Sequence, residues 1–217
     1  LDGKRVRVIH NGVDLSRFEP APVADAKLAL GQAPNTPLFG VFGRLSEEKG
    51  QRVAIEAMFL LLKEHPDARL VLAGEGKDEA DLRTAAAALG IVESIEFAGF
   101  ASDVRPLMAA CDAVIVPSIK EGFGLAAVEA MAMGRPVIAS AVGGLPEIVA
   151  PGETGILVAP NDPNALATAL EELIEKPGTA AEMGKRGRER VRQSFDRSAQ
   201  VRLVFDCLRE MAASRAT

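Results

Sequence analysis

The 217-residue sequence contains no tryptophan, no tyrosine and only two cysteines. Without tryptophan and tyrosine, intrinsic fluorescence is a poor probe of ligand binding to this chain. Cys111 and Cys207 lie far apart in the sequence and match neither a metal-ligand spacing nor a redox spacing. We therefore expect two reduced thiols in the core of a cytosolic protein.

Long apolar runs are missing as well. No run approaches the ~20 residues that span a bilayer, and no signal peptide is visible. The formal net charge is −5, which disfavours a nonspecific nucleic-acid binder because such domains are usually basic. These absences favour a cytoplasmic protein that does not bind nucleic acid. The first residue is Leu1 rather than methionine, which favours an excised piece of something longer.

The sequence does contain a regular alternation of short apolar runs and longer amphipathic stretches. Six runs are typical of strands buried on both faces: Leu38 to Phe42, Arg69 to Ala73, Ile95 to Ala98, Ala113 to Val116, Pro136 to Ser140 and Ile156 to Val158. Between them, apolar residues recur at helical spacing. The pattern predicts an α/β fold, a Rossmann-like parallel sheet of about six strands with helices on both faces. Ligands of such sheets bind at the carboxyl ends of the strands.

The two ends of the chain depart from this alternation and border a sheet domain over residues 21–194. In residues 1–20, Val6 to Ile9 predicts a short inter-domain strand, followed by a turn and a loop. Residues 195–217 predict a helix with a single apolar stripe, formed by Val201, Val204, Phe205 and Leu208. This helix either packs on a missing N-terminal domain or docks back on its own sheet.

The first stretch with chemical potential is Gly43-Arg44-Leu45-Ser46-Glu47-Glu48-Lys49-Gly50, directly after the first predicted strand. The Arg44 guanidinium can hold a phosphate with two parallel hydrogen bonds, and the Lys49 ammonium adds a compact charge. A helix N-terminus beside them adds partial positive charge. The segment therefore predicts a diphosphate site. A solvated loop in which both cations pair with Glu47 and Glu48 explains the segment equally well.

A second stretch, Gly74-Glu75-Gly76, follows the second predicted strand. Glycines at such a position let the backbone approach a ligand closely, although a plain tight turn explains the pattern better. The dinucleotide fingerprint requires a third glycine, which Asp78 to Ala80 does not supply. This absence disfavours an NAD-dependent oxidoreductase.

The third stretch, Pro117 to Ser140, is the most informative because seven residues and a glycine-rich turn separate Glu121 from Glu129. The backbone N–H groups of Gly122 to Leu125, at the start of a predicted helix, are free to face an anion. Carboxylates suit sugar and ribose hydroxyls because each accepts two or more hydrogen bonds. Glu129 lies among apolar helix residues, so its carboxylate needs a partner or a ligand.

With these motifs in order, the chain resembles the C-terminal domain of retaining glycosyltransferases with the GT-B fold, in the family-4 and glycogen-synthase-like group. The resemblance rests on the Glu121-x7-Glu129 motif, on Gly43 to Gly50 and on the opening Val8 to Asp14, and it covers Val6 to about Phe205. It implies transfer of a sugar from a nucleoside-diphosphate sugar of UDP, GDP or ADP, without a cofactor. Asp-x-Asp occurs nowhere, which disfavours a metal-bridged diphosphate.

The resemblance also implies roles for individual residues. Arg44 and Lys49 would bind the donor diphosphate and, together with Glu121, form the catalytic set. Glu129 would bind the ribose hydroxyls, and Glu121 a hydroxyl of the transferred sugar. The other donor-binding positions are backbone and lining contacts: Gly122, Phe123, Gly124 and Leu125 at the sugar and distal phosphate, Gly99, Phe100 and Ala101 at the nucleobase, and Gly74 and Glu75 in the cleft.

In this family the acceptor site and a frequently catalytic histidine belong to an N-terminal domain, and neither His10 nor His65 is placed for that role. We therefore expect a hexosyltransferase fragment that is inactive alone. A stand-alone nucleotide-sugar-binding module acting with a separate acceptor-binding chain remains an alternative, as does an epimerase or phosphorylase of the same two-domain fold. Peripheral membrane contact of the whole enzyme also stays open, although the basic run Lys185 to Arg192 is better explained as a solvated helix face.

Overall fold

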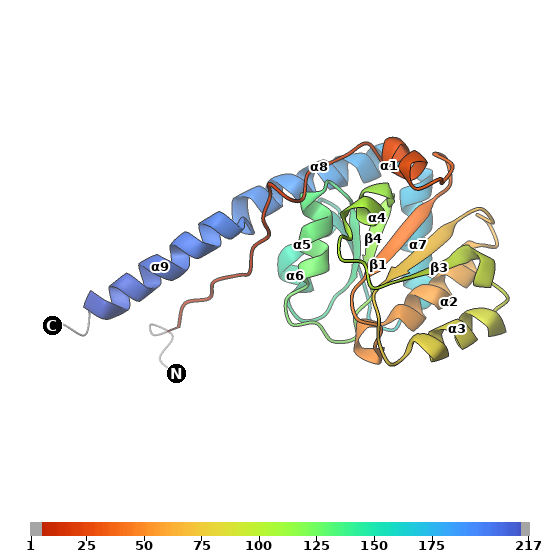
Figure 1. Ribbon diagram of the computed structural model, residues 1–217, viewed down its shortest axis with the longest axis horizontal. Coiled ribbons are helices and arrows are strands. Elements are labelled where there is room, and N and C mark those ends of the chain that lie inside the picture. The colour runs from red at the N-terminus through yellow and green to blue at the C-terminus, as the bar shows by residue number, and fades with distance from the viewer. Residues whose placement is uncertain (1–5, 214–217) are drawn as a thin grey trace.

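The computed structural model describes residues 6–213, which are built around a six-stranded parallel sheet (Figure 1). The strands are β1 (Leu38–Phe42), β2 (Arg69–Ala73), β3 (Ile95–Gly99), β4 (Ala113–Val116), β5 (Val137–Ser140) and β6 (Gly155–Val158). Their order in the sheet is β3-β2-β1-β4-β5-β6. Every one of the six expected sheet strands forms, with an end shifted by no more than one residue. The predicted Rossmann-like α/β fold is therefore confirmed.

Helices cover both faces of the sheet (Figure 1). The apolar cluster on one face includes side chains of α2 (Gln51–Leu61), α3 (Glu79–Ala88) and α7 (Pro163–Glu175). The cluster on the other face includes side chains of α4 (Arg105–Ala110), α5 (Leu125–Ala132), α6 (Leu145–Ile148) and, at its margin, α1 (Val23–Ala29). Helix α8 (Pro177–Ser194) contributes to both clusters, and the 3-10 turns are η2 (Glu47–Lys49) and η3 (Val92–Ser94).

Alternate side chains of each central strand enter opposite clusters. In β4, Val114 belongs to one cluster and Ile115 to the other, and both are essentially inaccessible to solvent. Fully burying an aliphatic side chain of this size contributes about 1.5–3 kcal/mol. The strand sequences are nearly continuous in apolar residues because helices cover the sheet on both sides.

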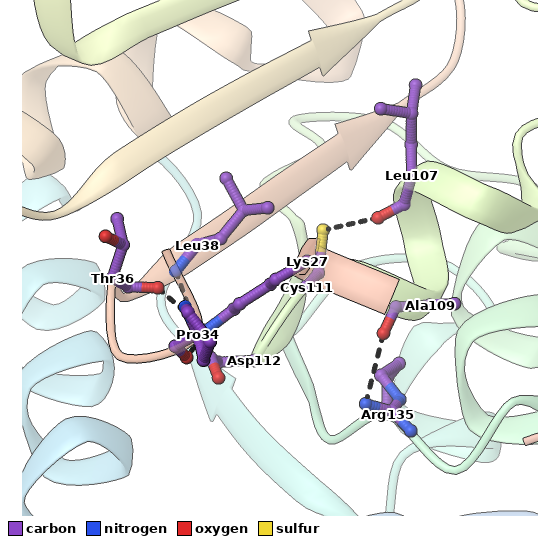
Figure 2. Close-up of polar contacts among 9 residues, drawn as sticks. All are labelled: Lys27, Pro34, Thr36, Leu38, Leu107, Ala109, Cys111, Asp112 and Arg135. Carbon is purple, nitrogen blue, oxygen red and sulfur yellow. Dashed lines mark hydrogen bonds and ion pairs between the residues drawn. The ribbon is translucent and has the colours of Figure 1, made fainter. Parts of the chain in front are cut away.

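At the amino edge of the sheet, where its strands begin, a polar cluster surrounds the buried ammonium of Lys27 of α1 (Figure 2). The Lys27 Nζ donates to Asp112 Oδ2 at 2.7 Å, and the same oxygen accepts the backbone N–H of Leu38 at 2.7 Å. Two backbone carbonyls complete the shell of Lys27, those of Pro34 at 3.2 Å and Thr36 at 2.7 Å. This ammonium therefore ties α1 to the amino ends of β1 and β4.

The N-terminal segment does not form the strand expected over Val6 to Ile9. Residues 6–12 have no regular secondary structure, and Val13 makes only an isolated bridge with Asp196. A strand needs a hydrogen-bonded neighbour, and this segment lies instead along α9 (Arg197–Ala213), outside the sheet. Arg7 pairs there with Glu210 at 3.3 Å.

Helix α9 extends away from the sheet domain (Figure 1). Its predicted apolar stripe is exposed in the structure: Val201, Val204, Phe205 and Leu208 are 40–58% accessible. The stripe therefore does not dock back on the sheet, and its packing on an N-terminal domain stays a prediction. No helix within residues 6–213 combines the length and apolar character needed to cross a bilayer.

The two cysteines lie in contrasting environments, and both are free thiols. Cys111 is buried, its Sγ donates to the Leu107 carbonyl at 3.2 Å, and burial raises the pKa of the thiol. Cys207 lies on α9 and is half-buried. The expectation of two core thiols is thus wrong for Cys207, because α9 leaves the core.

The basic run on α8 is only partly a solvated face. Arg188 donates to the carbonyls of Phe18 and Ala132, and Arg190 donates to those of Ile148 and Glu147, both at 2.7 Å. The other basic residues of the run pair with glutamates of the same helix: Lys185, Arg186 and Arg192. The expectation of a solvated face is therefore wrong for Arg188 and Arg190, which fasten α8 to the N-terminal loop, α5 and α6.

Candidate functional site

The site lies where the strand order reverses, between β1 and its neighbour β4. The chain passes from β1 to β2 on one side of the sheet and later returns to β4 on the other side. Such a switch point leaves a crevice at the carboxyl ends of the strands. Two loops meet there, and the Glu48 carbonyl joins them by accepting the N–H groups of Ile119 at 2.8 Å and Lys120 at 3.1 Å.

A cavity of about 370 Å³ opens at this crevice. Its walls include five of the predicted site residues, namely Arg44, Lys49, Glu121, Leu125 and Glu129. The first two follow β1, the third follows β4, and the last two lie on α5. Two cations and two carboxylates that are distant in the sequence are thereby brought around one cavity.

Lys49 and Glu121 form a direct ion pair across the two loops. The Lys49 Nζ donates to Glu121 Oε2 at 2.8 Å, and the Ser118 hydroxyl donates to the same oxygen at 3.1 Å. The Glu121 side chain is only 11% exposed, and that of Lys49 is 29% exposed. Across residues 6–213 no group donates to Oε1 of Glu121, and Lys49 makes this single pair. Both groups therefore keep hydrogen-bonding capacity for a ligand.

Arg44 is held less firmly than Lys49. Its guanidinium pairs with Glu48 four residues along the same loop, and its side chain is 68% exposed. The alternative of a solvated loop with internal ion pairs thus holds for Arg44 and fails for Lys49. An exposed pair of this kind contributes little free energy. An anion in the cavity can therefore compete with Glu48 for Arg44.

Glu129 presents a partly buried carboxyl group to the cavity from the second turn of α5. Burial raises the pKa of this carboxyl above its usual value, and the nearby Arg17 partly offsets the rise. In the described part of the chain the carboxyl group has no hydrogen-bond or salt-bridge partner. A partly buried carboxyl without a partner is costly unless a ligand satisfies it.

The N-terminus of α5 supplies open backbone donors beside the two glutamates. The N–H groups of residues 122–126 donate to no acceptor anywhere in residues 6–213. Gly143, with φ +53°, lies against this loop, and a Cβ on it would stand 1.7 Å from the Glu121 carbonyl oxygen. Only glycine fits there without moving the loop. The amides can therefore face an anion at the helix N-terminus.

The other predicted residues lie around the cavity rather than in its walls. An added Cβ on Gly74 would stand 2.0 Å from the Gly43 carbonyl oxygen, so the Gly74-Glu75-Gly76 turn packs against the loop that carries Arg44. The Gly74 N–H donates to the Gly99 carbonyl at 2.8 Å, which links this turn to the end of β3. Phe100 follows β3 and is 71% exposed. Gly122, Phe123 and Gly124 form the turn before α5.

Sequence reasoning missed two residues that shape the site. Gln51 is 2% exposed and its Nε2 donates to the Arg44 carbonyl at 2.8 Å, so it holds the loop that carries both cations. Its Oε1 has no partner within residues 6–213. Ser118 fixes Glu121 and is fully buried. The sequence does offer one signal for Gln51. It is a polar residue directly after Gly50, at the point where the apolar helix positions begin.

The same described residues contain no group of three or more His, Cys, Asp and Glu side chains arranged to hold a metal ion. The charged groups that line the cavity are instead Arg44, Lys49, Glu121 and Glu129.

Comparison with known proteins places this site in a family. The family model described as Glycosyl transferases group 1 matches residues 25–190. A D-inositol 3-phosphate glycosyltransferase of Streptomyces avermitilis is 38% identical over 196 residues, which cover 83% of this chain and 42% of that protein. A glycogen synthase of Mycobacterium tuberculosis is 36% identical over 193 residues, covering 88% and 45%. The chain thus spans about half the length of the curated relatives it matches.

Solved structures agree with this assignment. Anabaena Alr3699/HepE in complex with UDP matches with a TM-score of 0.87 and 32% identity, over 94% of this chain and 57% of that chain. The C-terminal domain of a glycosyl transferase group 1 family protein (LpcC) from Francisella tularensis matches with a TM-score of 0.77 and 32% identity, over 85% and 99%. The neighbours have the GT-B fold, and the chain covers its C-terminal half. The resemblance is confirmed, and the chain belongs to the glycosyl transferases group 1 family.

Proposed function

We propose that this chain is the donor-binding half of a retaining, cytoplasmic hexosyltransferase that takes its sugar from a nucleoside-diphosphate sugar. The observation that carries the proposal is the cavity lined by Arg44, Lys49, Glu121 and Glu129 beside the open amides of α5. Cations and amides suit a diphosphate, and carboxylates suit hydroxyl groups. A relative whose solved structure is a complex with UDP adds support.

The cations are placed to stabilise the leaving group. When the bond from the anomeric carbon to the distal phosphate oxygen breaks, negative charge builds on that oxygen. Arg44, Lys49 and the amides of Gly122 to Leu125 are the groups that would meet this charge, and preorganised donors of this kind supply much of the stabilisation in enzymes. They stand in the role that a metal ion takes elsewhere, so we propose transfer without a metal. By family resemblance the acceptor attacks from the face that the leaving group departs.

The two carboxylates are placed to recognise hydroxyl groups. Donation from Lys49 and Ser118 to one oxygen of Glu121 holds that carboxylate in place and leaves Oε1 for a hydroxyl of the transferred sugar. The Glu129 carboxyl would accept the ribose hydroxyls, which would satisfy a buried group that has no partner among the described residues. The nucleobase would then lie against Gly99 to Ala101 after β3.

An acceptor-binding N-terminal domain completes the proposal. The chain spans about half of its curated relatives and covers the C-terminal half of its structural neighbours, which is the basis for this step. We propose that sugar transfer requires that domain and that this chain alone binds the donor without turnover.

Calorimetric titration of the chain with UDP, GDP and ADP, in buffer without divalent metal, tests the donor site directly. We expect one of the three to bind at a single site. Lys49→Ala should weaken that binding about ten- to a hundredfold, because a charge-assisted hydrogen bond contributes about 1.5–3 kcal/mol. Lys185→Ala, which removes an exposed cation of α8, is the matched control and should bind like the wild type. No binding by any of the three, or unchanged binding by Lys49→Ala, would contradict the proposal.

A further inference from the structure

Three aromatic rings meet just outside the cavity, each from a different part of the chain. His10 comes from the N-terminal segment, Phe123 from the turn before α5 and Phe195 from the joint between α8 and α9. The centroids of His10 and Phe123 are 6.1 Å apart with a 25° angle between the rings. Phe195 meets both edge-on, with centroids 5.8 Å from His10 and 5.9 Å from Phe123. Stacked and edge-on pairs at these separations attract each other.

His10 is held on its other side by α6. Its Nε2 donates to Glu147 Oε2 at 2.9 Å. Gly143 and Gly144, just before α6, lie in close contact with the backbone of Glu121, Gly122 and Phe123. The turn that carries Glu121 is therefore enclosed between the start of α6 and the ring cluster, and His10 bridges the two.

The segment that carries His10 is fastened to the α8–α9 joint. The Val13 N–H donates to the Phe195 carbonyl at 2.9 Å, and the Arg197 N–H donates back to the Val13 carbonyl at 3.0 Å. The Gly12 N–H donates to the Gln200 side chain at 3.0 Å. Phe195 itself is only 3% exposed and anchors the cluster in the core. The position of the His10 ring thus depends on contacts between the N-terminal segment and the first turns of α9.

The turn of residues 121–124 is not anchored by its own backbone N–H groups. Two of its four residues are glycines, and the amides of residues 122–124 donate to nothing within residues 6–213. Besides Glu121, which Lys49 and Ser118 hold, Phe123 is the residue of the turn whose side chain fixes its conformation, through its contacts with His10 and Phe195. Phe123 lies two residues after Glu121, so its placement also sets where the Glu121 backbone and the amides point.

We propose that His10 is a positioning residue for donor binding, acting through Phe123 on the turn that carries Glu121 and the open amides. The inference rests on the proposed function, because it concerns the affinity of the same site. A change in how the N-terminal segment packs against α9 would then alter the donor site through the ring of His10.

Calorimetry with whichever of UDP, GDP and ADP binds the wild-type chain tests the inference. His10→Ala should weaken binding about two- to tenfold, the range expected for the loss of an aromatic pair. His10→Phe keeps a ring in the cluster and should restore the wild-type affinity to within about twofold. His65→Ala, which changes a residue of the loop between α2 and β2, is the control and should leave the affinity unchanged.

Proton NMR adds a readout that stability alone would not move. The sequence has only two histidines, so the two imidazole signals can be assigned with the His10 and His65 variants. Saturating nucleotide should shift the His10 signal and leave the His65 signal in place. Failure of all three nucleotides to bind the wild type would overturn the proposed function and this inference with it. Wild-type binding with an unchanged affinity in His10→Ala, whatever its melting temperature, would overturn this inference alone.

Discussion

The sheet has cations at its amino edge, where the strands begin, and at its carboxyl edge, where they end. The two edges differ in how many hydrogen bonds the protein itself makes to these cations. At the amino edge, Lys27 is 2% exposed, and its ammonium donates to two carbonyls and to Asp112 (Figure 2). Arg135, 7% exposed, donates to the carbonyls of Met133, Ala109 and Ala21. At the carboxyl edge, Lys49 donates to Glu121 alone within residues 6–213, and Arg44 pairs with Glu48 in solvent.

The difference separates a structural cation from a candidate binding cation. An ammonium has three N–H donors, and at Lys27 the protein itself occupies all three. Lys49 keeps donors that face a cavity, beside the partly buried carboxyl of Glu129, which has no partner among the described residues, and a row of open amides. Each edge carries one lysine and one arginine, so the hydrogen bonds that each cation already makes decide which of them is available to a ligand.

Removing the structural cation should have the largest effect. Lys27→Met would take the buried ammonium away from Asp112 and from two backbone carbonyls, and would leave Asp112 with only the Leu38 N–H as a donor. We therefore expect a loss of about 1.5–3 kcal/mol in the free energy of unfolding. Urea unfolding followed by far-UV circular dichroism measures it. Lys185→Met removes an exposed cation of α8 and should change stability by less than about 0.5 kcal/mol. A loss below about 1 kcal/mol for Lys27→Met would remove the distinction between the two edges.

Glu129→Gln should move affinity and stability in opposite directions. Loss of the charged acceptor should weaken binding of the nucleoside diphosphate about tenfold or more. Burial raises the pKa of Glu129, so its charged form destabilises the fold above the usual glutamate value of 4.5. The variant should therefore melt at a higher temperature than the wild type at pH 7.5, and this gain should shrink towards pH 4.

Calorimetry and differential scanning calorimetry measure the two effects of Glu129→Gln. Glu172→Gln, an exposed residue of α7 paired with Lys176, is the control and should change neither the affinity nor the pH dependence of melting. A lower melting temperature for Glu129→Gln at pH 7.5 would show that the carboxylate is satisfied in the folded chain.

Glu48→Gln should have the smallest effect on binding affinity, and it tests whether Arg44 at the carboxyl edge is available to a ligand. The Arg44–Glu48 pair is exposed and contributes only about 0.3–0.5 kcal/mol. Freeing Arg44 should therefore tighten binding of the diphosphate about twofold. Glu172→Gln, which breaks an equivalent pair on α7, should leave the affinity unchanged. Weaker or unchanged binding by Glu48→Gln would argue that Arg44 does not touch the phosphates.

The sheet could be predicted closely because its four central strands, β1, β2, β4 and β5, are buried on both faces. A run such as Ala113 to Val116 is apolar throughout and ends where the composition changes, so the limits of the strand can be read from the sequence alone. The strand over Val6 to Ile9 was predicted wrongly because the same local pattern carries no information about a neighbour. In the fold this segment lies along α9, where Arg7 pairs with Glu210, and it joins neither of the outermost strands, β3 and β6.

The candidate site was predictable as a set of residue types and not as an arrangement. Local motifs indicated Arg44, Lys49, Glu121 and Glu129, and the cavity contains all four. Nothing in the motif around Lys49 indicated that it pairs with Glu121 rather than with Glu47 or Glu48. Gln51 was missed because its role depends on the path of a loop that only the fold defines.

By itself, the sequence determined the alternation of strands and helices and the chemical types present at each strand end, because periodicity and turn residues act over a few neighbouring positions. The tertiary structure alone decided that β1 and β4 lie side by side, which brings Lys49 within 2.8 Å of Glu121. It also decided that α9 and Cys207 leave the core and that His10 meets Phe123. These are long-range contacts, and they depend on the packing of the whole chain.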